Sequence, residues 1–199
     1  MLGQHNVHAL FPKNCFLCVV EEKPEDFRHF FKFGAITRPM EIILRHITKE
    51  DTEAYFKAHD EDAAKFFATY PTTMEEAAKE VQEILDAYEV PKEKRTKETF
   101  AIDIGGMFAG FIAIHHIVRG KEGTTGSLVA PEFRGRGVGT QAHKLLLAYA
   151  FKTYKLKKIY GRTKLANKAS QRMLEKSGYK YEKTIETEGG KKKLYVVFS

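Results

Sequence analysis

The chain has 199 residues, of which 43% are hydrophobic and 30% are charged. These proportions are typical of a single globular domain with one substantial core, and they exclude a chain that is disordered throughout. The formal net charge of +7 has two interpretations: attraction to a polyanion such as RNA or a phosphorylated cofactor, or a lysine-rich solvated surface.

The positive charges gather late in the chain, within residues 152–158 and 191–193. They are not interleaved with aromatic residues as in a stacking platform for single strands, which argues against a dedicated nucleic-acid module. No apolar run approaches the roughly 20 residues of a membrane span. The first residues also lack the basic-then-apolar pattern of a secretory signal. We therefore expect a cytoplasmic protein without a membrane partner, as a monomer or homodimer.

The first 39 residues have weak periodicity and are expected to form an N-terminal extension that packs on the core of a domain over 40–199. Within the extension, Cys15–Val20 is compatible with a strand. The aromatic-rich stretch Pro24–Phe33 is compatible with a short helix, and Pro39 ends the segment.

The two cysteines of the chain follow two histidines, as His5-x-x-His8 and then Cys15-x-x-Cys18. Four such ligand types could hold zinc, although the short spacing between the pairs is unlike the usual finger. Cys15 and Cys18 also border an apolar run, where cysteine packs as a small hydrophobe. We favour the structural interpretation of these residues.

From Met40 the pattern becomes regular. Met40–Ile47 predicts a strand, and Thr48 followed by Asp51 is typical of a helix start with a hydroxyl cap and a carboxylate three residues later. The helix that follows is expected to reach about Ala68, with a possible break near Asp60. A second helix is expected to begin in Pro71–Glu76 and to continue to about Tyr88.

The rest of the chain alternates strands and helices. A hairpin is predicted around the turn Gly105–Gly106, and a second one around Gly189–Gly190. The predicted elements are strands over 100–104, 107–117, 124–130, 158–163, 179–187 and 193–198, and helices over 139–154 and 167–176. Hairpins followed by alternating helices and strands predict a mixed α/β sheet.

A glycine-rich loop joins the strand that ends at Ala130 to the helix that begins near Gly139. Its sequence is Arg134-Gly135-Arg136-Gly137-Val138-Gly139. Three glycines allow a tight turn whose amides point one way, at a helix N-terminus where the dipole favours an anion. The loop is neither a P-loop, since Thr140-Gln141 replaces Lys-Ser/Thr, nor a dinucleotide fingerprint. It predicts a site for phosphate oxygens, with the two arginines adding charge, unless the glycines serve only the geometry of the turn.

Arg134, Gly137 and Gly139 also match the pattern Arg/Gln-x-x-Gly-x-Gly/Ala. Two further stretches accompany it: Asn167-Lys-Ala-Ser170 followed by Leu174-Glu-Lys-Ser-Gly-Tyr179, and Phe108-Ala-Gly-Phe-Ile-Ala113. On these residues, the sequence over 40–199 resembles the GNAT superfamily of N-acetyltransferases. The run from Gly126 to Tyr181 is similar to the branch that acetylates ribosomal-protein N-termini, which also contains many small-amine acetyltransferases.

The resemblance implies a mixed, strongly bent central sheet flanked by helices, with acetyl-CoA wedged where the strands at 124–130 and 158–163 splay. By position, Leu128 and Val129 would pair with the pantetheine arm and hold the thioester carbonyl. Asn167 would bind the pantetheine side or cap its helix. The backbone amides that would bind the pyrophosphate are those of Arg134, Gly135, Arg136, Gly137, Val138, Gly139 and Thr140.

Direct transfer of an acetyl group requires a neutral primary amine, on a small molecule or a protein N-terminus, and then a proton for the departing thiolate. About a tenth of an α-amine with pKa about 8 is neutral at pH 7, against about 0.04% of a lysine. The tyrosine that usually serves as acid in the superfamily is replaced by Leu174. The serine that serves instead in the ribosomal branch corresponds to Ser170, which is our candidate acid.

No general base can be assigned from the sequence. The carboxylate that the ribosomal branch carries early in the splayed strand is replaced by Thr124. His115, His116 and Glu122 are the other candidates, and at most one of the two histidines faces the site because successive strand residues point to opposite faces. Covalent transfer through Cys15 or Cys18 lacks a histidine–carboxylate partnership.

Three functions are thus open from the sequence. The first is an acetyl-CoA-dependent N-acetyltransferase that uses no metal. The second is a catalytically impaired module that binds acyl-CoA and regulates, suggested by Leu174 and the missing base. The third is a ribosome- or RNA-associated protein, suggested by the net charge.

Overall fold

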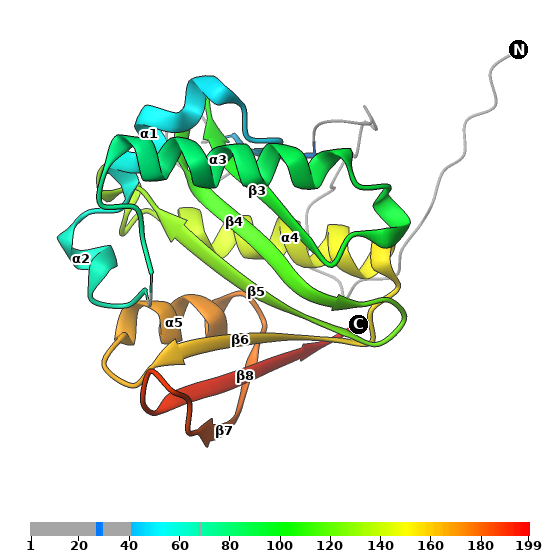
Figure 1. Ribbon diagram of the computed structural model, residues 1–199. Helices are drawn as coiled ribbons and strands as arrows, with labels where there is room; N and C mark the ends of the chain where they lie inside the picture. Colours follow the sequence, from blue (N-terminus) through cyan, green and yellow to red (C-terminus); the bar gives the residue numbers. More distant parts are fainter. Residues whose placement is uncertain (1–26, 30–40, 68) are drawn as a thin grey trace, which may run out of the picture.

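The computed structural model describes residues 27–29, 41–67 and 69–199, and Figure 1 shows their arrangement. Within these residues one sheet has the strand order β1-β2-β3-β4-β5-β6-β8-β7. Its strands are β1 Phe27–His29, β2 Ile42–Arg45, β3 Lys97–Ile104, β4 Met107–Val118, β5 Glu122–Val129, β6 Lys158–Lys164, β7 Lys180–Ile185 and β8 Lys192–Phe198. All neighbouring strands are antiparallel except the pair β5 and β6.

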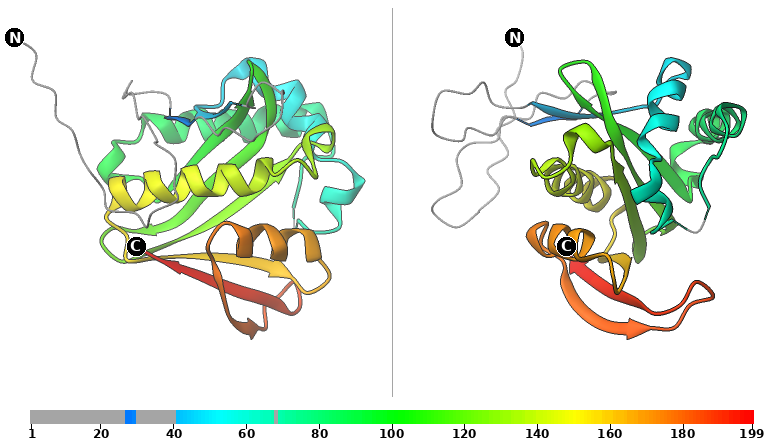
Figure 2. Two further views of the ribbon diagram at one scale, coloured as in Figure 1. Left: turned by 180° about the vertical axis from the view of Figure 1, so that it is seen from behind. Right: turned by 90° about the vertical axis from the view of Figure 1, so that its left-hand side faces the viewer.

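Helices cover both faces of this sheet. Seen edge-on in Figure 2, α1 and α3 lie on one side, and α4 and α5 on the other. The helices are α1 Thr52–Ala58, α2 Glu61–Ala64, α3 Met74–Glu89, α4 Val138–Tyr154 and α5 Lys168–Lys176, with single turns of 3-10 helix at Lys49–Asp51, Lys92–Lys94 and Pro131–Phe133. No helix in the described part of the chain has the length and apolar content that a membrane crossing requires.

The two long helices form where the apolar spacing places them. In α3, Ala77, Val81 and Ile84 are buried at helical spacing, and Thr73 caps the first turn by accepting a hydrogen bond from the Glu76 amide. In α4 the apolar positions are so closely spaced that most of the helix circumference is buried. The helix α3 packs on β3, and α4 packs on β2, β4 and β5 from the other side of the sheet, so that the two helices complete the core.

Most predicted elements are confirmed, including the mixed α/β sheet, both hairpins and the break near Asp60. The helix expected to reach Ala68 is wrong in extent, since α2 ends at Ala64. The helix expected over Pro24–Phe33 is wrong at Phe27–His29, because these residues form β1 and pair with β2. The expected strand at Cys15–Val20 and the His5, His8, Cys15, Cys18 cluster lie outside the described residues.

The strands β5 and β6 pair over half of their length only. Their register runs from Glu122↔Lys158 to Thr125↔Gly161 and ends there. Beyond Thr125 the strands diverge toward the end of the sheet that α2 and α5 flank, as Figure 1 shows. This splay leaves the last residues of β5 without a neighbouring strand on the β6 side.

Candidate active site

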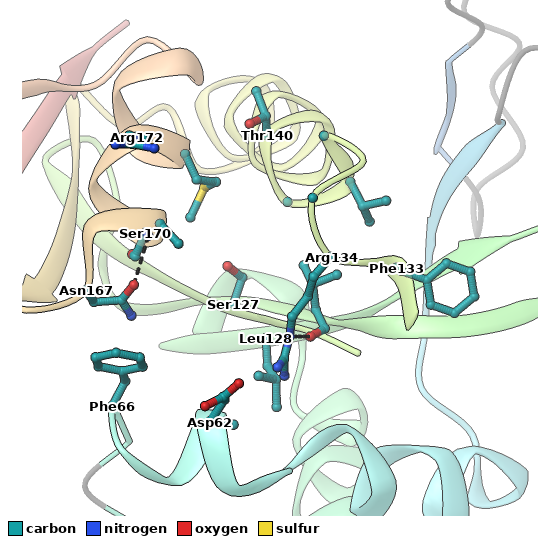
Figure 3. A pocket seen from close by; sticks show the side chains of 18 of the residues that line it. Asp62, Phe66, Ser127, Leu128, Phe133, Arg134, Thr140, Asn167, Ser170 and Arg172 are labelled. Carbon is teal, nitrogen blue, oxygen red and sulfur yellow. Dashed lines mark hydrogen bonds between the residues drawn. The ribbon is translucent and has the colours of Figure 1, made fainter. Parts of the chain in front are cut away.

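A cleft of about 590 Å³ opens at the splay, between α2, the end of β5, the glycine loop and α5. Figure 3 shows how side chains from these four segments face one another across it. Its lining residues include Asp62, Phe66, Phe67, Ser127, Leu128, Val129, Phe133, Arg134, Gly135, Gly137, Val138, Gly139, Thr140, Asn167, Ser170, Arg172, Met173 and Lys176. The structure thus brings together every site residue expected from the sequence except Arg136, which is exposed and does not line the cleft.

The N-terminus of α4 faces this cleft without a partner from the described residues. Gly137 adopts φ +82° and precedes the helix, and no side chain caps the first turn, which also contains no acidic residue. The first intrahelical bond runs from the Gln141 amide to the Gly137 carbonyl, so the amides of Val138, Gly139 and Thr140 have no acceptor within the helix. The helix α3 has both a cap and two glutamates at this place. An anion bound at the start of α4 would supply what α3 obtains from its own chain.

Glycine is required at two points of the loop. Gly135 and Gly137 have φ of +75° and +82°, and a Cβ at either position would meet no atom within 4 Å. Both positions are therefore open toward ligand or solvent, and a side chain would be limited by backbone strain rather than by a clash. The amide of Arg134, in contrast, already donates to the Pro131 carbonyl.

The Arg134 side chain joins the loop to α2. Its guanidinium donates two hydrogen bonds to the Asp60 carboxylate, at 2.7 and 2.9 Å, and a third from Nε to the Val129 carbonyl at 2.8 Å. The hydrogen bonds from Arg134 lower the pKa of Asp60, which also accepts from the Ala63 amide at the start of α2. The charge of Arg134 is thus balanced by Asp60, and the pair holds two walls of the cleft together.

The unpaired edge of β5 presents backbone donors to the cleft. The Ala130 amide donates to Ala109 of β4, so the Val129 amide points away from β4 and into the splay. By the same alternation the Ser127 amide also points into the splay, whereas Leu128 faces β4 with its backbone and the cleft with its side chain. Two amide donors thus stand in a row beside a hydrophobic side chain, which suits an extended ligand that contains amides and a carbonyl.

A second, smaller cavity of about 160 Å³ continues the cleft through the sheet, between β5 and β6; we call it the slot. Its lining residues are Phe66, Phe67, Thr125, Gly126, Ser127, His143, Arg162, Thr163, Lys164, Asn167, Ser170, Met173, Leu174 and Lys192. Because the slot shares Ser127, Asn167 and Ser170 with the cleft, the two cavities meet at these residues, beside Leu128, one of the two residues expected to hold the thioester carbonyl.

Buried polar groups lie on the α4 side of this junction. The Ser127 hydroxyl lies 3.0 Å from Nε2 of His143, and His143 Nδ1 lies 3.5 Å from the Tyr179 hydroxyl. Tyr179 in turn lies 2.7 Å from the Thr125 hydroxyl, which donates to the Tyr160 carbonyl. Burial alone lowers the pKa of His143 to about 4, so this imidazole is neutral near pH 7.

One assignment of the protons satisfies every contact in this chain, and it starts from the last member. A carbonyl only accepts, so Thr125 spends its single hydroxyl proton on Tyr160 and must accept from Tyr179. Tyr179 then accepts from His143 Nδ1–H, and His143 Nε2 accepts from Ser127. The Ser127 proton therefore points away from the cleft, and its oxygen is available there as a hydrogen-bond acceptor.

The α5 wall carries the two expected polar residues. Asn167 caps the helix, since its Oδ1 accepts from the Ser170 amide at 2.9 Å, and it also lines both cavities. The Ser170 hydroxyl has no hydrogen-bond partner among the described residues and faces the junction of cleft and slot. Leu174, in the place of the usual tyrosine, is buried against Gly161, where a Cβ would stand 2.7 Å from it.

The three candidate bases differ in their distance from the site. The His115 side chain lies near Gly126 of the slot, with Nε2 3.8 Å from the position that a Cβ of Gly126 would take. Burial lowers its pKa to about 4, helped by the charges of His116, Lys97 and Arg162. His116 is exposed, and Glu122 forms an ion pair with Lys158 at the paired end of β5. None of the three lines the cleft or the slot.

Sequence reasoning missed His143, Tyr179 and Arg162. His143 sits on the buried face of α4 between Ala142 and Leu145, and this one polar residue in an apolar helix face was the available signal. Tyr179 follows the glycine that ends α5, where it resembles an ordinary core residue. Arg162 lies on β6, and the sequence alone does not show that β6 is placed between β5 and β8, which brings Arg162 to the slot.

Comparison with known proteins identifies the family of the chain. Residues 41–180 match the family model described as an acetyltransferase (GNAT) domain. The chain is 27% identical over 144 residues to the spermidine N(1)-acetyltransferase of Escherichia coli strain K12, an alignment that covers 71% of this chain and 74% of that protein.

Solved structures with the same fold were found with coenzyme A bound. The structure of Mycobacterium smegmatis RimJ in complex with a CoA disulfide superposes with a TM-score of 0.69 at 18% identity, covering 80% of this chain and 83% of that one. RimL, a ribosomal L7/L12 α-N-protein acetyltransferase in complex with coenzyme A, superposes with a TM-score of 0.69 at 16% identity, covering 79% and 93%. At these identities, the likeness establishes the fold.

Proposed function

The chain belongs to the GNAT family of acetyltransferases, and we propose that its cleft holds acetyl-CoA with the pyrophosphate at the start of α4 and the thioester at the slot. The protein is an acetyl-CoA-dependent N-acetyltransferase that acts on a primary amine. The observation that carries the placement is the uncapped N-terminus of a 17-residue helix, opening into a cleft beside the unpaired edge of a strand. The free amides and the open glycine positions fit a pyrophosphate.

The residues of the chain would act as follows. The amides of residues 135–140 hold the pyrophosphate oxygens, and Arg134 keeps the loop in place through Asp60. The Val129 and Ser127 amides and the Leu128 side chain align the pantetheine arm. One of these two amides, which point into the splay, then donates a hydrogen bond to the thioester carbonyl. Asn167 keeps the start of α5 against this arm.

In the transfer, the amine nitrogen forms a bond to the thioester carbon, the carbon–sulfur bond breaks, and the amine loses a proton while the thiolate gains one. Ser170 is proposed to donate the proton to the thiolate, because its hydroxyl faces the junction and has no other partner among the described residues. Ser127 accepts a hydrogen bond there, since His143 orients its proton away.

Two measurements test this function. Isothermal titration with acetyl-CoA should show stoichiometric binding, and absence of binding at millimolar acetyl-CoA would refute the proposed cleft. Coenzyme A release should then be followed with a panel of amines, polyamines, aminoglycosides and N-terminal peptides. Binding without thiol release for any amine would support the regulatory module instead of the enzyme.

A further inference from the structure

The slot opens on a face of β6 and β8 that is positively charged. Lys164 and Lys192 are directly paired across these strands, and Arg162 lies two residues from Lys164 on the same face. The intervening residue and Gly161 point the other way, toward α5, as the contact of Gly161 with Leu174 shows. We call Arg162, Lys164 and Lys192 the basic wall. In the right-hand view of Figure 2, α5 lies on one face of these strands, so the basic wall is on the other.

The basic wall is not neutralised by the described residues. Arg162 and Lys192 have no ion-pair partner there, and the Lys164 ammonium donates to the Lys65 carbonyl, which is uncharged. Among the described residues, no carboxylate lines the slot. Asp62 of the neighbouring cleft is paired with Lys65 at 2.6 Å. The charge of Arg162 also contributes to the lowered pKa of His115 across the sheet, so the positive field extends over the mouth of the slot.

This arrangement selects among primary amines. A polyamine or an aminoglycoside carries several positive charges and would be repelled by the basic wall at the point where its amine must enter. An amine that also bears a negative group would be attracted and oriented, with the arginine able to bind a carboxylate or phosphate in a bidentate manner. The small volume of the slot, about 160 Å³, admits only the reacting end of such a molecule.

We propose that the acceptor is a primary amine that also carries a carboxylate or phosphate group, which Arg162 and Lys192 bind while the amine reaches the thioester through the slot. The inference rests on the proposed function and deepens it. It also separates this protein from its spermidine-acetylating relative, whose substrate has no negative group.

The test compares amines that differ only in the negative group. Coenzyme A release is measured with ethanolamine phosphate against ethanolamine, with an amino acid against its amide, with an acidic peptide against its Asn/Gln counterpart, and with spermidine. We expect the anionic member of at least one pair to have a kcat/KM at least tenfold higher than its neutral partner and than spermidine. The pair that responds identifies a phosphate, a free amino acid or a peptide terminus as the source.

Variants locate the effect. Arg162→Glu should remove or reverse the preference for the anionic member, whereas Lys144→Glu, on the exposed face of α4 outside both cavities, should keep it. Titration with coenzyme A should give the same affinity for the wild type and Arg162→Glu, because Arg162 does not line the cleft. This binding control separates the two proposals, since loss of coenzyme binding by the wild type would count against the cleft and not against the basic wall.

Three outcomes would overturn the inference while coenzyme A still binds. These are a preference for spermidine or the neutral member of every pair, an unchanged preference in Arg162→Glu, and no turnover of any anionic amine in the panel.

Discussion

The placement of pyrophosphate at the start of α4 leads to a charge-specific prediction for Gly137. Replacement by Asp or by Asn introduces side chains of nearly equal size. Both residues tolerate the backbone conformation at φ +82° better than other non-glycine residues do. A Cβ at this position meets no atom within 4 Å. The two variants therefore share the strain and differ in one negative charge. A carboxylate about 5 Å from a phosphate charge costs about 1–3 kcal/mol for each pair of unit charges near a protein surface.

The expected result is a Kd for coenzyme A about 5- to 150-fold weaker in Gly137→Asp than in Gly137→Asn. The stability of the free protein should change in the opposite direction. Gly137→Asp should be more stable than Gly137→Asn, since a negative charge at a helix N-terminus stabilises the helix by about 0.3–1 kcal/mol. Isothermal titration at low and high salt, with thermal unfolding of the same samples, measures both effects. Equal affinities of the two variants at low salt would show that no phosphate lies at these amides. A difference that persists undiminished at high salt would argue against charge as its cause.

Three further predictions follow from the packing and the buried groups. Gly110→Ala should lower the free energy of unfolding by roughly 3 kcal/mol, which corresponds to a decrease in Tm of about 6–12 °C. The reason is that at φ +137° the added Cβ would stand 2.1 Å from the Leu128 carbonyl oxygen. Gly106→Ala, at φ +85° in open space, should cost only about 2–4 °C, and equal shifts in calorimetry would contradict the clash. His143 has its pKa lowered to about 4, so the unfolded state binds more protons and stability should fall as pH drops from about 6.5 toward 4. Urea unfolding of His143→Gln should show a weaker pH dependence, and an unchanged one would mean that this imidazole is not held neutral. Ser170→Ala should lower kcat by at least about a hundredfold with little change in KM for acetyl-CoA, and an unaltered kcat in steady-state assays would exclude Ser170 as the proton donor.

The elements that the sequence predicted well are those whose cause is local. The start of α4 was expected at Gly139 and lies at Val138, because the glycine loop and the apolar spacing that follows it are contiguous in the chain. The turn at Gly105–Gly106 likewise joins two strands that pair directly. In contrast, β1 depends on its pairing with β2, and no local pattern separates three strand residues from the start of a short helix.

The part of the site that the sequence did not predict is made by contacts between distant segments. The pair Arg134–Asp60 joins residues 74 positions apart, so the expected phosphate-binding arginine could not be recognised as a link to α2. The hydrogen bonds from Thr125 to His143 likewise join β5, α4 and Tyr179, the residue directly before β7. Residue types and spacing predicted the loop, but the state of each side chain required the order of the strands.

The basic wall also bears on the missing base. Among the described residues, the titratable groups that line the slot are the cations Arg162, Lys164 and Lys192 and the neutral imidazole of His143, and Asp62 of the adjoining cleft is paired with Lys65. Positive neighbours disfavour an ammonium ion, so an amine in the slot has a lower pKa than in water and a larger neutral fraction at pH 7. For an α-amine with pKa about 8, a lowering by one unit raises that fraction from about a tenth to about a half. On the proposed binding mode, the basic wall would both select the acceptor and raise the neutral fraction of its amine, so that the reaction would not require a carboxylate at Thr124.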